Sequence, residues 1–352
     1  MLKPGATIGI LGGGQLGRML AMAALPLGYR CIGYAPEGDN VAIDVCADFF
    51  ANKWNDEAAL AAFAAQCDVV TWEFENVPLA AVDALPKKRL NPARIALETA
   101  QDREHEKHFV EGLGGRPAPW ARVESRADLE AAANRIGTPG ILKTCRDGYD
   151  GKGQWRIRND RDVEALSLPA ARCVYEGLVQ FDAEFSVVLV RGQEGEIRFW
   201  DSTRNEHDDG ILARCFHPAG EHIEPQVEEA RKLARQIAEK LGYVGVLTLE
   251  FFATPQGPVF NEMAPRVHNS GHWTIEGAVT SQFENHIRAI CGLPLGDTRT
   301  LAPRIEMRNI IGKDVETAHD CLREPDAHLH LYGKARAREG RKMGHVTRLF
   351  GA

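Results

Sequence analysis

Carboxylate, guanidinium, imidazole and amide groups are concentrated in one short stretch, residues 260–272. Its sequence, FNEMAPRVHNSGH, comes at the end of an apolar run. Side chains of these types can bind metal ions and anions. The chemistry that this stretch predicts is therefore that of a metal–nucleotide site.

A lone acid, Glu250, lies in the apolar run 244–253, and the turn-like segment TPQG (254–257) separates this run from the next. If the two runs form an antiparallel hairpin, Glu250 faces Asn261 or Glu262 to within one register step. Opposed carboxylates repel each other unless a cation lies between them. Mg²⁺ takes oxygen ligands, usually one or two carboxylates plus substrate phosphates. The alternative is a surface hairpin with solvated acids, which is less favoured because these acids interrupt apolar strands. We therefore predict a metal site at Glu250 and Glu262.

Two glycine-rich loops are candidates for binding phosphate. The first, GGGQLG at 12–17, follows a strand-like run and opens a helix, so backbone N–H groups and a helix N-terminus would face the anion. A dinucleotide site would also need an acid at the end of the second strand, but Glu37 and Asp39 lie in the turn beyond it. NAD, another phosphate and a mere tight turn all remain open for this loop.

The second loop, DGYDGKGQ at 147–154, lies between two strand-like runs. Its glycines would let the backbone close over a ligand, as the glycine-rich loop of protein kinases covers ATP. Lys143, on the preceding run, could reach a phosphate as a point charge. The loop alone could be a flexible hairpin tip. Together with Glu250 and Glu262, however, the lysine and the loop predict a Mg·ATP site.

Three sections of the chain would position these residues. From Thr7 to about Pro92, strand-like and helical segments alternate, which favours a parallel, doubly wound sheet. Ligands of such sheets bind beyond the carboxyl ends of the strands, so Glu73 and Glu75 are well placed to contact one. The middle section mixes strands and helices as in an α+β domain, and its clearest helix is 225–241.

The last section contains a basic run, and by itself such a run is typical of a solvated face. Its members are Lys334, Arg336, Arg338, Arg341, Lys342 and His345.

Bulk composition indicates a soluble protein of more than one domain. The chain has 352 residues, with 44% hydrophobic and 26% charged. Its net charge of −7 gives no reason to expect nucleic acid or an anionic membrane as a partner. No apolar run approaches the ~20 residues that span a bilayer. The eight cysteines stand singly and the N-terminus lacks a signal-peptide core, so we expect reduced thiols and a cytoplasmic location.

Over nearly its whole length the chain resembles the ATP-grasp superfamily, and most closely its 5-(carboxyamino)imidazole ribonucleotide synthetases. The resemblance rests on GGGQLG at 12–17, GYDGKGQ at 148–154, Asn205 and His207 before Gly210-Ile211, NEMAPRVHNSGHWT at 261–274, YGK at 332–334 and RKMGH at 341–345. It implies an α/β and α+β multidomain ATP-grasp fold. The expected parts are a Rossmann-like pre-ATP-grasp domain with a parallel sheet (1–100), an ATP-grasp domain (101–292) with a lid at about 118–180, and a small β-rich C-terminal domain (293–352).

The resemblance also implies the ATP and metal sites. The phosphates would be held by Arg103, Lys143, Gly148, Tyr149, Asp150, Gly151, Lys152, Gly153 and Gln154. The adenine hinge would be Glu176, Gly177, Leu178 and Val179, with Glu184 on the ribose and His207 near the nucleotide. Glu250 and Glu262 would bind Mg²⁺ or Mn²⁺, assisted by Asn261. Without the family, Glu176 looks like an ordinary exposed acid and His207 like a surface histidine, and Lys152 stands where arginine is more usual.

The implied substrates are ATP, bicarbonate and 5-aminoimidazole ribonucleotide, bound by a homodimer. Lys334 and Arg341 would clamp the 5′-phosphate. The residues around the ribonucleotide or carboxyphosphate would be Gln15, Leu16, Glu73 or Glu75, Tyr149, Asp150, Arg266, His268 and Asn269. Arg266, Asp150, His268 and Lys143 are the expected catalytic residues, with Arg266 on bicarbonate or carboxyphosphate and Asp150 on the exocyclic amine.

The implied reaction forms 5-(carboxyamino)imidazole ribonucleotide, ADP and phosphate in de novo purine (IMP) biosynthesis. ATP would first convert bicarbonate, a poor electrophile, into carboxyphosphate. A formate-dependent glycinamide ribonucleotide transformylase is the alternative within the superfamily and differs at 261–274. An NAD-dependent oxidoreductase built on 12–17, or a nucleotide-sensing module without catalysis, would belong to other classes.

Overall fold

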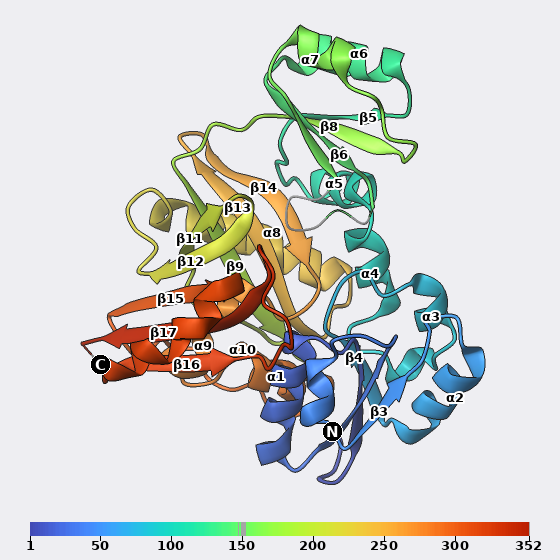
Figure 1. Ribbon diagram of the computed structural model, residues 1–352, viewed down its shortest axis with the longest axis vertical. Coiled ribbons are helices and arrows are strands. Elements are labelled where there is room, and N and C mark those ends of the chain that lie inside the picture. Colours follow the sequence, from blue (N-terminus) through green and yellow to red (C-terminus); the bar gives the residue numbers. More distant parts are fainter. Residues whose placement is uncertain (147, 149–152, 352) are drawn as a thin grey trace.

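The computed structural model describes residues 1–146, 148 and 153–351. These residues form three sheets, which Figure 1 shows as an N-terminal sheet, a lid sheet and a large central sheet. The loop positions Tyr149, Asp150, Gly151 and Lys152 lie outside the described residues.

The N-terminal sheet is parallel throughout, with strand order β3-β2-β1-β4, which confirms the predicted sheet. Its strands are β1 (Thr7–Leu11), β2 (Arg30–Ala35), β3 (Asp48–Ala51) and β4 (Val69–Trp72). Its α-helices are α1 (Gln15–Ala24), α2 (Glu57–Gln66), α3 (Leu79–Asp83) and α4 (Arg94–Ala100). Short 3₁₀ turns lie at Leu25–Leu27, Val41–Asp44 and Lys87–Arg89.

The lid sheet follows helix α5 (Arg103–Gly112) and is antiparallel, with order β5-β8-β6-β7. Its strands are β5 (Trp120–Val123), β6 (Gly140–Thr144), β7 (Gln154–Ile157) and β8 (Cys173–Gly177), and its helices are α6 (Arg126–Ile136) and α7 (Asp160–Ala165). Leu129, Leu142, Ile157 and Tyr175 belong to a core cluster confined to this unit. The lid sheet therefore has an apolar core of its own.

The central sheet has nine antiparallel strands, in the order β14-β13-β9-β11-β12-β15-β17-β16 with β10 beside β9. The strands are β9 (Ala183–Arg191), β10 (Ile197–Phe199), β11 (Thr203–Asp208), β12 (Ile211–His217), β13 (Gly245–Thr254), β14 (Gly257–Ala264), β15 (Arg304–Ile311), β16 (Ala327–Leu331) and β17 (Lys342–Phe350). The C-terminal strands thus extend this sheet, because β15 pairs with β12.

Helices of the central sheet include α8 (Val227–Lys240), α9 (Thr274–Gly277) and α10 (Gln282–Ile290). The predicted helix 225–241 is confirmed as α8, which buries Ala230, Leu233, Ala234 and Ile237, but its first turn is the separate 3₁₀ segment Glu224–Gln226. Further 3₁₀ segments are Asn269–Gly271 and Gly312–Arg323.

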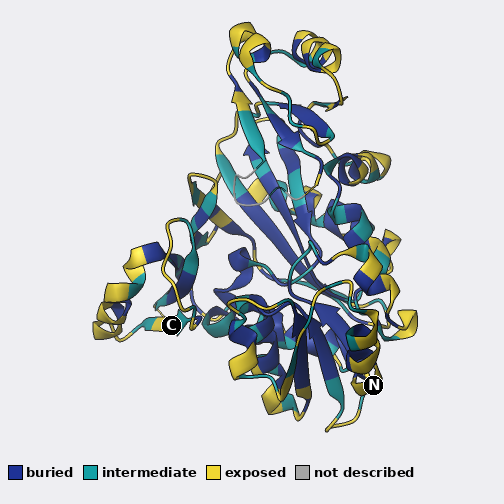
Figure 2. Ribbon diagram, turned by 45° about the vertical axis from the view of Figure 1, so that its right-hand side comes forward, coloured by how far each residue is buried: buried dark blue, intermediate teal, exposed yellow. Residues whose placement is uncertain are grey.

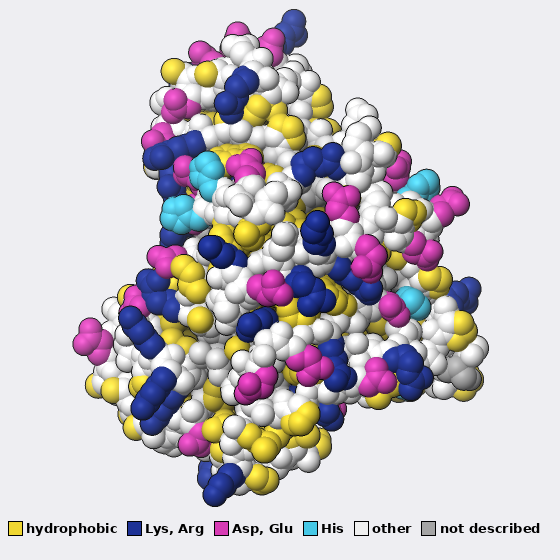
Figure 3. Space-filling view, turned by 180° about the vertical axis from the view of Figure 1, so that it is seen from behind, with side chains coloured by type: hydrophobic (Ala, Val, Ile, Leu, Met, Phe, Trp, Pro, Cys, Tyr) yellow, Lys and Arg dark blue, Asp and Glu magenta, His cyan; other side chains and the backbone are white. Residues whose placement is uncertain are grey.

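Two large core clusters join the N-terminal sheet to the central sheet. One contains Trp72 together with Leu249, and the other contains Ile8 together with Ile287. Figure 2 shows the resulting band of buried strands with exposed helix faces around it. On the face seen from behind in Figure 3, basic and acidic side chains are interspersed. Among the described residues, no helix combines the length and apolarity needed to cross a membrane.

Candidate functional site

The predicted hairpin is confirmed. Strands β13 and β14 pair antiparallel with Glu250 directly opposite Glu262, and a register shift follows Glu250. The two acids therefore face each other from neighbouring strands, as their spacing around the turn predicted.

Each acid of this pair contacts a cationic or imidazole side chain. Glu262 Oε2 lies 3.2 Å from Arg103 Nη1, and Glu250 Oε1 lies 3.3 Å from His268 Nε2. Burial, and next the charge of Glu262, raise the pKa of the Glu250 carboxyl to about 7. A carboxylate pair with this repulsion and with oxygen donors only is the type of donor set that suits a hard divalent cation.

The pair lies in a cleft of about 940 Å³. Residues of the lid sheet and the central sheet line it, together with the start of α1 and the segment that follows β4. Most of the predicted site residues line it together. They are Gln15, Leu16, Glu73, Glu75, Arg103, Lys143, Gly148, Gln154, Glu176, Gly177, Leu178, Val179, Glu184, His207, Glu250, Asn261, Glu262, Arg266, His268 and Asn269. Gly153, Lys334 and Arg341 do not line it.

Glu176 is not the exposed acid that its sequence context indicated. It is the penultimate residue of β8 and is 5% exposed, and its carboxylate lies between two lysines. Lys143 Nζ donates a hydrogen bond to Oε2 at 2.8 Å, and Lys107 Nζ lies 3.0 Å from Oε1. Burial favours the protonated acid, but Lys143 and then Lys107 outweigh it and lower the pKa of Glu176 to about 2. The group is therefore an anion at neutral pH.

His207 is half-buried rather than a surface histidine, and its Nδ1 lies 2.8 Å from Glu184 Oε2. Burial disfavours the imidazolium, but contact with Glu184 and the charge of Glu250 outweigh burial and raise the pKa of His207. The two residues lie on neighbouring strands, β11 and β9. Strand pairing thus fixes this polar pair at the wall of the cleft.

The first glycine-rich loop, residues 12–17, was a candidate for binding phosphate, but in the structure it binds the Glu73 side chain. Glu73 accepts hydrogen bonds from the backbone N–H groups of Gly14, at 2.7 Å, and Gly17, at 3.2 Å. Gly12 has φ +118°, and a Cβ there would lie 2.2 Å from Glu73 Cγ. The N-terminus of α1 is therefore already occupied by a carboxylate, which argues against the dinucleotide site considered above.

Beside Glu73, Glu75 forms an ion pair with Arg266. Gln282 accepts a hydrogen bond from the His268 backbone N–H, at 2.9 Å, and donates one to the His268 carbonyl, at 2.6 Å. Burial and the charge of Arg266 lower the pKa of His268 well below its usual range. Because the Ser270 N–H donates to His268 Nδ1, the neutral ring carries its proton on Nε2, toward Glu250.

The two residues expected to clamp a phosphate contact protein groups. Lys334 Nζ donates to the Lys342 carbonyl at 2.6 Å, and Arg341 Nη2 lies 2.7 Å from Asp39 Oδ2. Burial and the charge of Arg341 lower the pKa of Lys334 to about 8. The charge of Glu73 acts in the opposite direction on the pKa of Lys334.

Several charged residues at or behind the cleft were missed in the sequence, among them Arg156 and Asp209, which line it. Glu106 and Lys342 line it, and Lys107 lies behind Glu176. Burial raises the pKa of Glu106 to about 8, although the Met263 N–H donates to its carboxyl group. The available signal was helical spacing, since residues 106 and 107 follow Arg103 by three and four positions on α5.

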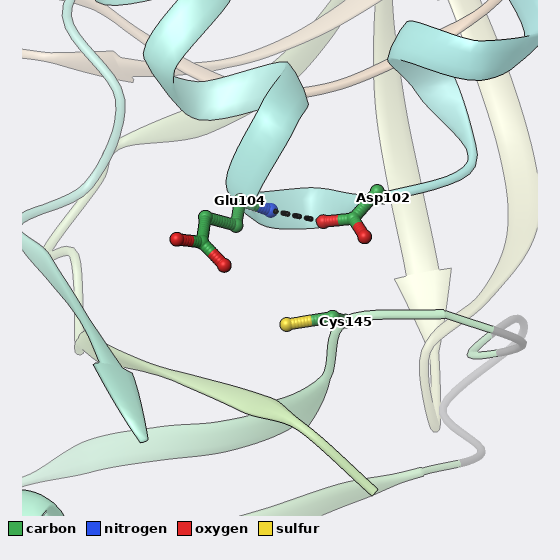
Figure 4. A group of neighbouring side chains, drawn as sticks. All are labelled: Asp102, Glu104 and Cys145. Atoms are coloured by element: carbon green, nitrogen blue, oxygen red, sulfur yellow. Dashed lines mark hydrogen bonds between the residues drawn. The ribbon is translucent and has the colours of Figure 1, made fainter. Parts of the chain in front are cut away.

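Among the described residues, Asp102, Glu104 and Cys145 form the one group of three or more His, Cys, Asp or Glu whose ligand atoms lie within 4.8 Å of one another (Figure 4). Arginines already neutralise the acids: Asp102 contacts Arg146 and Arg172, and Glu104 contacts Arg172. Burial and the charge of Asp102 raise the pKa of the Cys145 thiol to about 11. The group is thus a charged junction between α5 and the lid sheet.

Comparison with known proteins accounts for all three parts of the chain. Residues 5–101 match the ribonucleotide synthetase preATP-grasp domain, residues 108–283 the ATP-grasp domain, and residues 306–350 the phosphoribosylaminoimidazole carboxylase C-terminal domain. The N5-carboxyaminoimidazole ribonucleotide synthase of Brucella melitensis is 47% identical over 354 residues, covering 99% of this chain and 97% of the relative.

Solved structures agree with these matches. The N5-carboxyaminoimidazole synthetase of Staphylococcus aureus complexed with ADP has a TM-score of 0.92 at 36% identity, covering 100% of this chain and 95% of the other. The Aspergillus clavatus synthase in complex with ADP and 5-aminoimidazole ribonucleotide has a TM-score of 0.87 at 29% identity, covering 99% and 94%. The resemblance inferred from the motifs is confirmed, and the chain belongs to the N5-carboxyaminoimidazole ribonucleotide synthase family of ATP-grasp enzymes.

Proposed function

We propose that the protein is an ATP-dependent ligase that carboxylates 5-aminoimidazole ribonucleotide, with bicarbonate as carbon source and carboxyphosphate as intermediate. The observation that supports the proposal is one cleft whose walls carry both cationic side chains and carboxylates. Arg103 contacts Glu262, and Lys143 lines the same cleft as Glu250 and Glu262. Arg266 forms an ion pair with Glu75, which follows strand β4 of the N-terminal sheet. Such an arrangement suits a nucleotide on one side and a smaller anion on the other.

ATP would lie against the lid sheet. Lys143, Arg103 and the loop that includes Gly148, Gly153 and Gln154 would bind its phosphates, as would Tyr149, Asp150, Gly151 and Lys152. The adenine would lie along Glu176–Val179, with its ribose toward Glu184 and His207. Fixed cations in a water-poor site can stabilise the charge on a moving γ-phosphoryl group.

Glu250 and Glu262 would hold Mg²⁺ or Mn²⁺, with Asn261 beside them. Their fit rests on the repulsion that raises the pKa of Glu250 and on their carboxylate oxygens. When bound, the metal would supply charge neutralisation for the phosphates. His268 would orient Glu250 through its Nε2–H, because its other ring nitrogen already accepts a hydrogen bond.

The ribonucleotide would bind toward the N-terminal sheet. Gln15, Leu16, Glu73 or Glu75, Tyr149 and Asn269 would surround it, with Lys334 and Arg341 on its 5′-phosphate. Arg266 would hold bicarbonate or carboxyphosphate, and Asp150 the exocyclic amine. Carboxyphosphate hydrolyses readily, so the lid would exclude water during the reaction.

We also propose that the protein is a cytoplasmic homodimer, and that its domains span residues 1–100, 101–292 and 293–352.

The test is phosphate release from ATP with bicarbonate present, with and without 5-aminoimidazole ribonucleotide. We expect the ribonucleotide to stimulate release and to become carboxylated. Stimulation by formate with glycinamide ribonucleotide instead would assign the chain to the transformylase alternative. ATP binding without phosphate release under any of these conditions would contradict both enzymatic functions.

A further inference from the structure

The Lys107 side chain is a buried cation that the proposed reaction does not use. It lies on α5 with 1% exposure, one turn beyond Arg103. Its Nζ lies 3.0 Å from Glu176 Oε1, whereas Lys143 Nζ binds the other oxygen of that carboxylate at 2.8 Å. One buried anion is therefore shared by two lysines that come from different elements, α5 and β6.

The sharing of Glu176 matters for nucleotide binding because of where Lys143 lies. Lys143 lines the cleft, and in the proposed function it binds phosphate. If Lys143 alone neutralised Glu176, turning its ammonium group toward a phosphate would leave a buried carboxylate unpaired. Removing one partner from a buried pair is strongly unfavourable, because the remaining charge has lost both water and its counterion. The single pair would therefore oppose nucleotide binding.

We propose that Lys107 is a positioning residue for ATP: it keeps Glu176 paired, so that Lys143 can exchange this carboxylate for the phosphates. This inference rests on the proposed nucleotide site. The three-group set carries one surplus positive charge, which an isolated Lys143–Glu176 pair would not. Lys107 thus acts through Glu176 and Lys143 and does not itself contact the nucleotide.

The test measures binding of ADP and of a non-hydrolysable ATP analogue by calorimetry, together with kcat and both substrate KM values. Lys107→Met should weaken nucleotide binding at least about tenfold, the effect of losing a charge-assisted contact. Lys107→Arg, which keeps the charge, should recover most of the affinity. The KM for the ribonucleotide should stay unchanged, and Lys240→Met, at the exposed end of α8, should match the wild type.

A double variant separates positioning from a general loss of stability. Lys107→Met with Glu176→Gln removes one buried cation together with the buried anion that it contacts, so it remains testable if Lys107→Met alone does not fold. Its nucleotide affinity should be no weaker than that of Glu176→Gln alone, because Lys107 acts through that carboxylate. Independent, multiplicative losses of affinity in the double variant would overturn the inference. A lower Tm accompanied by equal rises of both KM values in Lys107→Met would also overturn it.

The same data distinguish this inference from the proposed function. If Lys143→Ala and Glu176→Gln weaken nucleotide binding while Lys107→Met does not, only the role of Lys107 is lost. If none of the three substitutions changes nucleotide binding, the proposed ATP site is wrong, and the inference that depends on it is wrong too.

Discussion

At the scale of single residues, Glu262 matters because its charge raises the pKa of Glu250 across the β13–β14 hairpin. We expect Glu262→Gln to lower turnover at least ~100-fold, because a neutral amide is a poorer ligand for a hard cation. The Tm should stay within a few degrees of wild type, since removing the charge also removes the repulsion. The measurement is phosphate release across a Mg²⁺ titration, with the exposed Glu239→Gln on α8 as control. Near-normal turnover at limiting Mg²⁺ would rule out this metal site.

The basic run near the C-terminus offers a second test at this scale. Lys334→Ala and Arg341→Ala should each raise the KM for the ribonucleotide by roughly ten- to hundredfold, as expected for a lost charge-assisted contact to phosphate. The KM for ATP should hardly change. Arg336→Ala is the control, because Arg336 is exposed and has no assigned ligand. Equal effects of all three substitutions would show that the run acts only as a charged surface.

How far the sequence predicts single residues depends on whether their partners are close in the chain. Glu250 and Glu262 could be paired from the turn between them, because a hairpin fixes its own register. Glu176 could not be recognised as buried, since its lysine partners lie on α5 and β6. The partnership arises only when the lid sheet packs beside α5, and spacing along the chain does not encode that contact.

At the scale of elements, the loop between β1 and α1 is closed by Glu73. A Cβ on Gly12 would lie 2.2 Å from Glu73 Cγ, and the φ of +118° adds backbone strain. We expect Gly12→Ala to reduce the free energy of unfolding by roughly 2–4 kcal/mol. Gly114→Ala is the matched control, because φ is +80° there but nothing lies within 4 Å of the new Cβ. Denaturant unfolding that gives the same loss for both variants would mean that the contact with Glu73 is unimportant.

His286 on α10 links two sheets. Its Nε2 lies 2.9 Å from Thr71 Oγ1 of β4, and its Nδ1 accepts the Val246 N–H of β13. Burial lowers its pKa to about 3, below the ~6.5 of an unfolded chain. Its contribution is therefore complete above pH 6.5 and is lost as the pH falls toward 3, since only the unfolded state binds the proton. When the pH falls from 7.5 to 5, the titration of His286 should therefore reduce the free energy of unfolding by roughly 2 kcal/mol.

The measurement is the free energy of unfolding at pH 7.5 and pH 5 for the wild type and for His286→Gln. The variant should lose less stability over this interval, because its amide does not titrate. An equal loss in both proteins would assign the acid sensitivity to other groups, such as His272 and His345, whose pKa values burial also lowers.

The elements themselves were predictable where the pattern was local. Helix α8 and the parallel N-terminal sheet follow from periodicity and from strand–helix alternation. The continuation of the central sheet into β15, β17 and β16 did not follow, because the register of distant strands leaves no local pattern. For the same reason, the sequence indicates a separate domain after residue 292, although the strands of this section join the central sheet.

At the scale of the whole molecule, the lid sheet differs from the rest in having its own core. The N-terminal and central sheets share two core clusters, whereas the junction of the lid with α5 contains the ion pairs of Asp102 and Glu104. ADP bound between Lys143 and Glu262 would connect the lid to the central sheet. We therefore expect ADP to slow amide hydrogen exchange in β6 and β8 at least severalfold, with little change in β1 and β2.

Hydrogen exchange followed by mass spectrometry, with and without ADP, is the measurement. Lys143→Ala supplies the control, because it should reduce the ADP-dependent protection without altering exchange of the free protein. Equal protection of the N-terminal sheet and the lid sheet would contradict an independent lid.

Strand β17 is the last strand described along the chain, yet it lies between β15 and β16 and pairs with both. The facing edges of β15 and β16 can therefore be paired only after the chain has been made through β17. Lys342, which lines the cleft, is carried by that same late strand. The part of the cleft wall that Lys342 forms consequently cannot be completed before β17 has been synthesised.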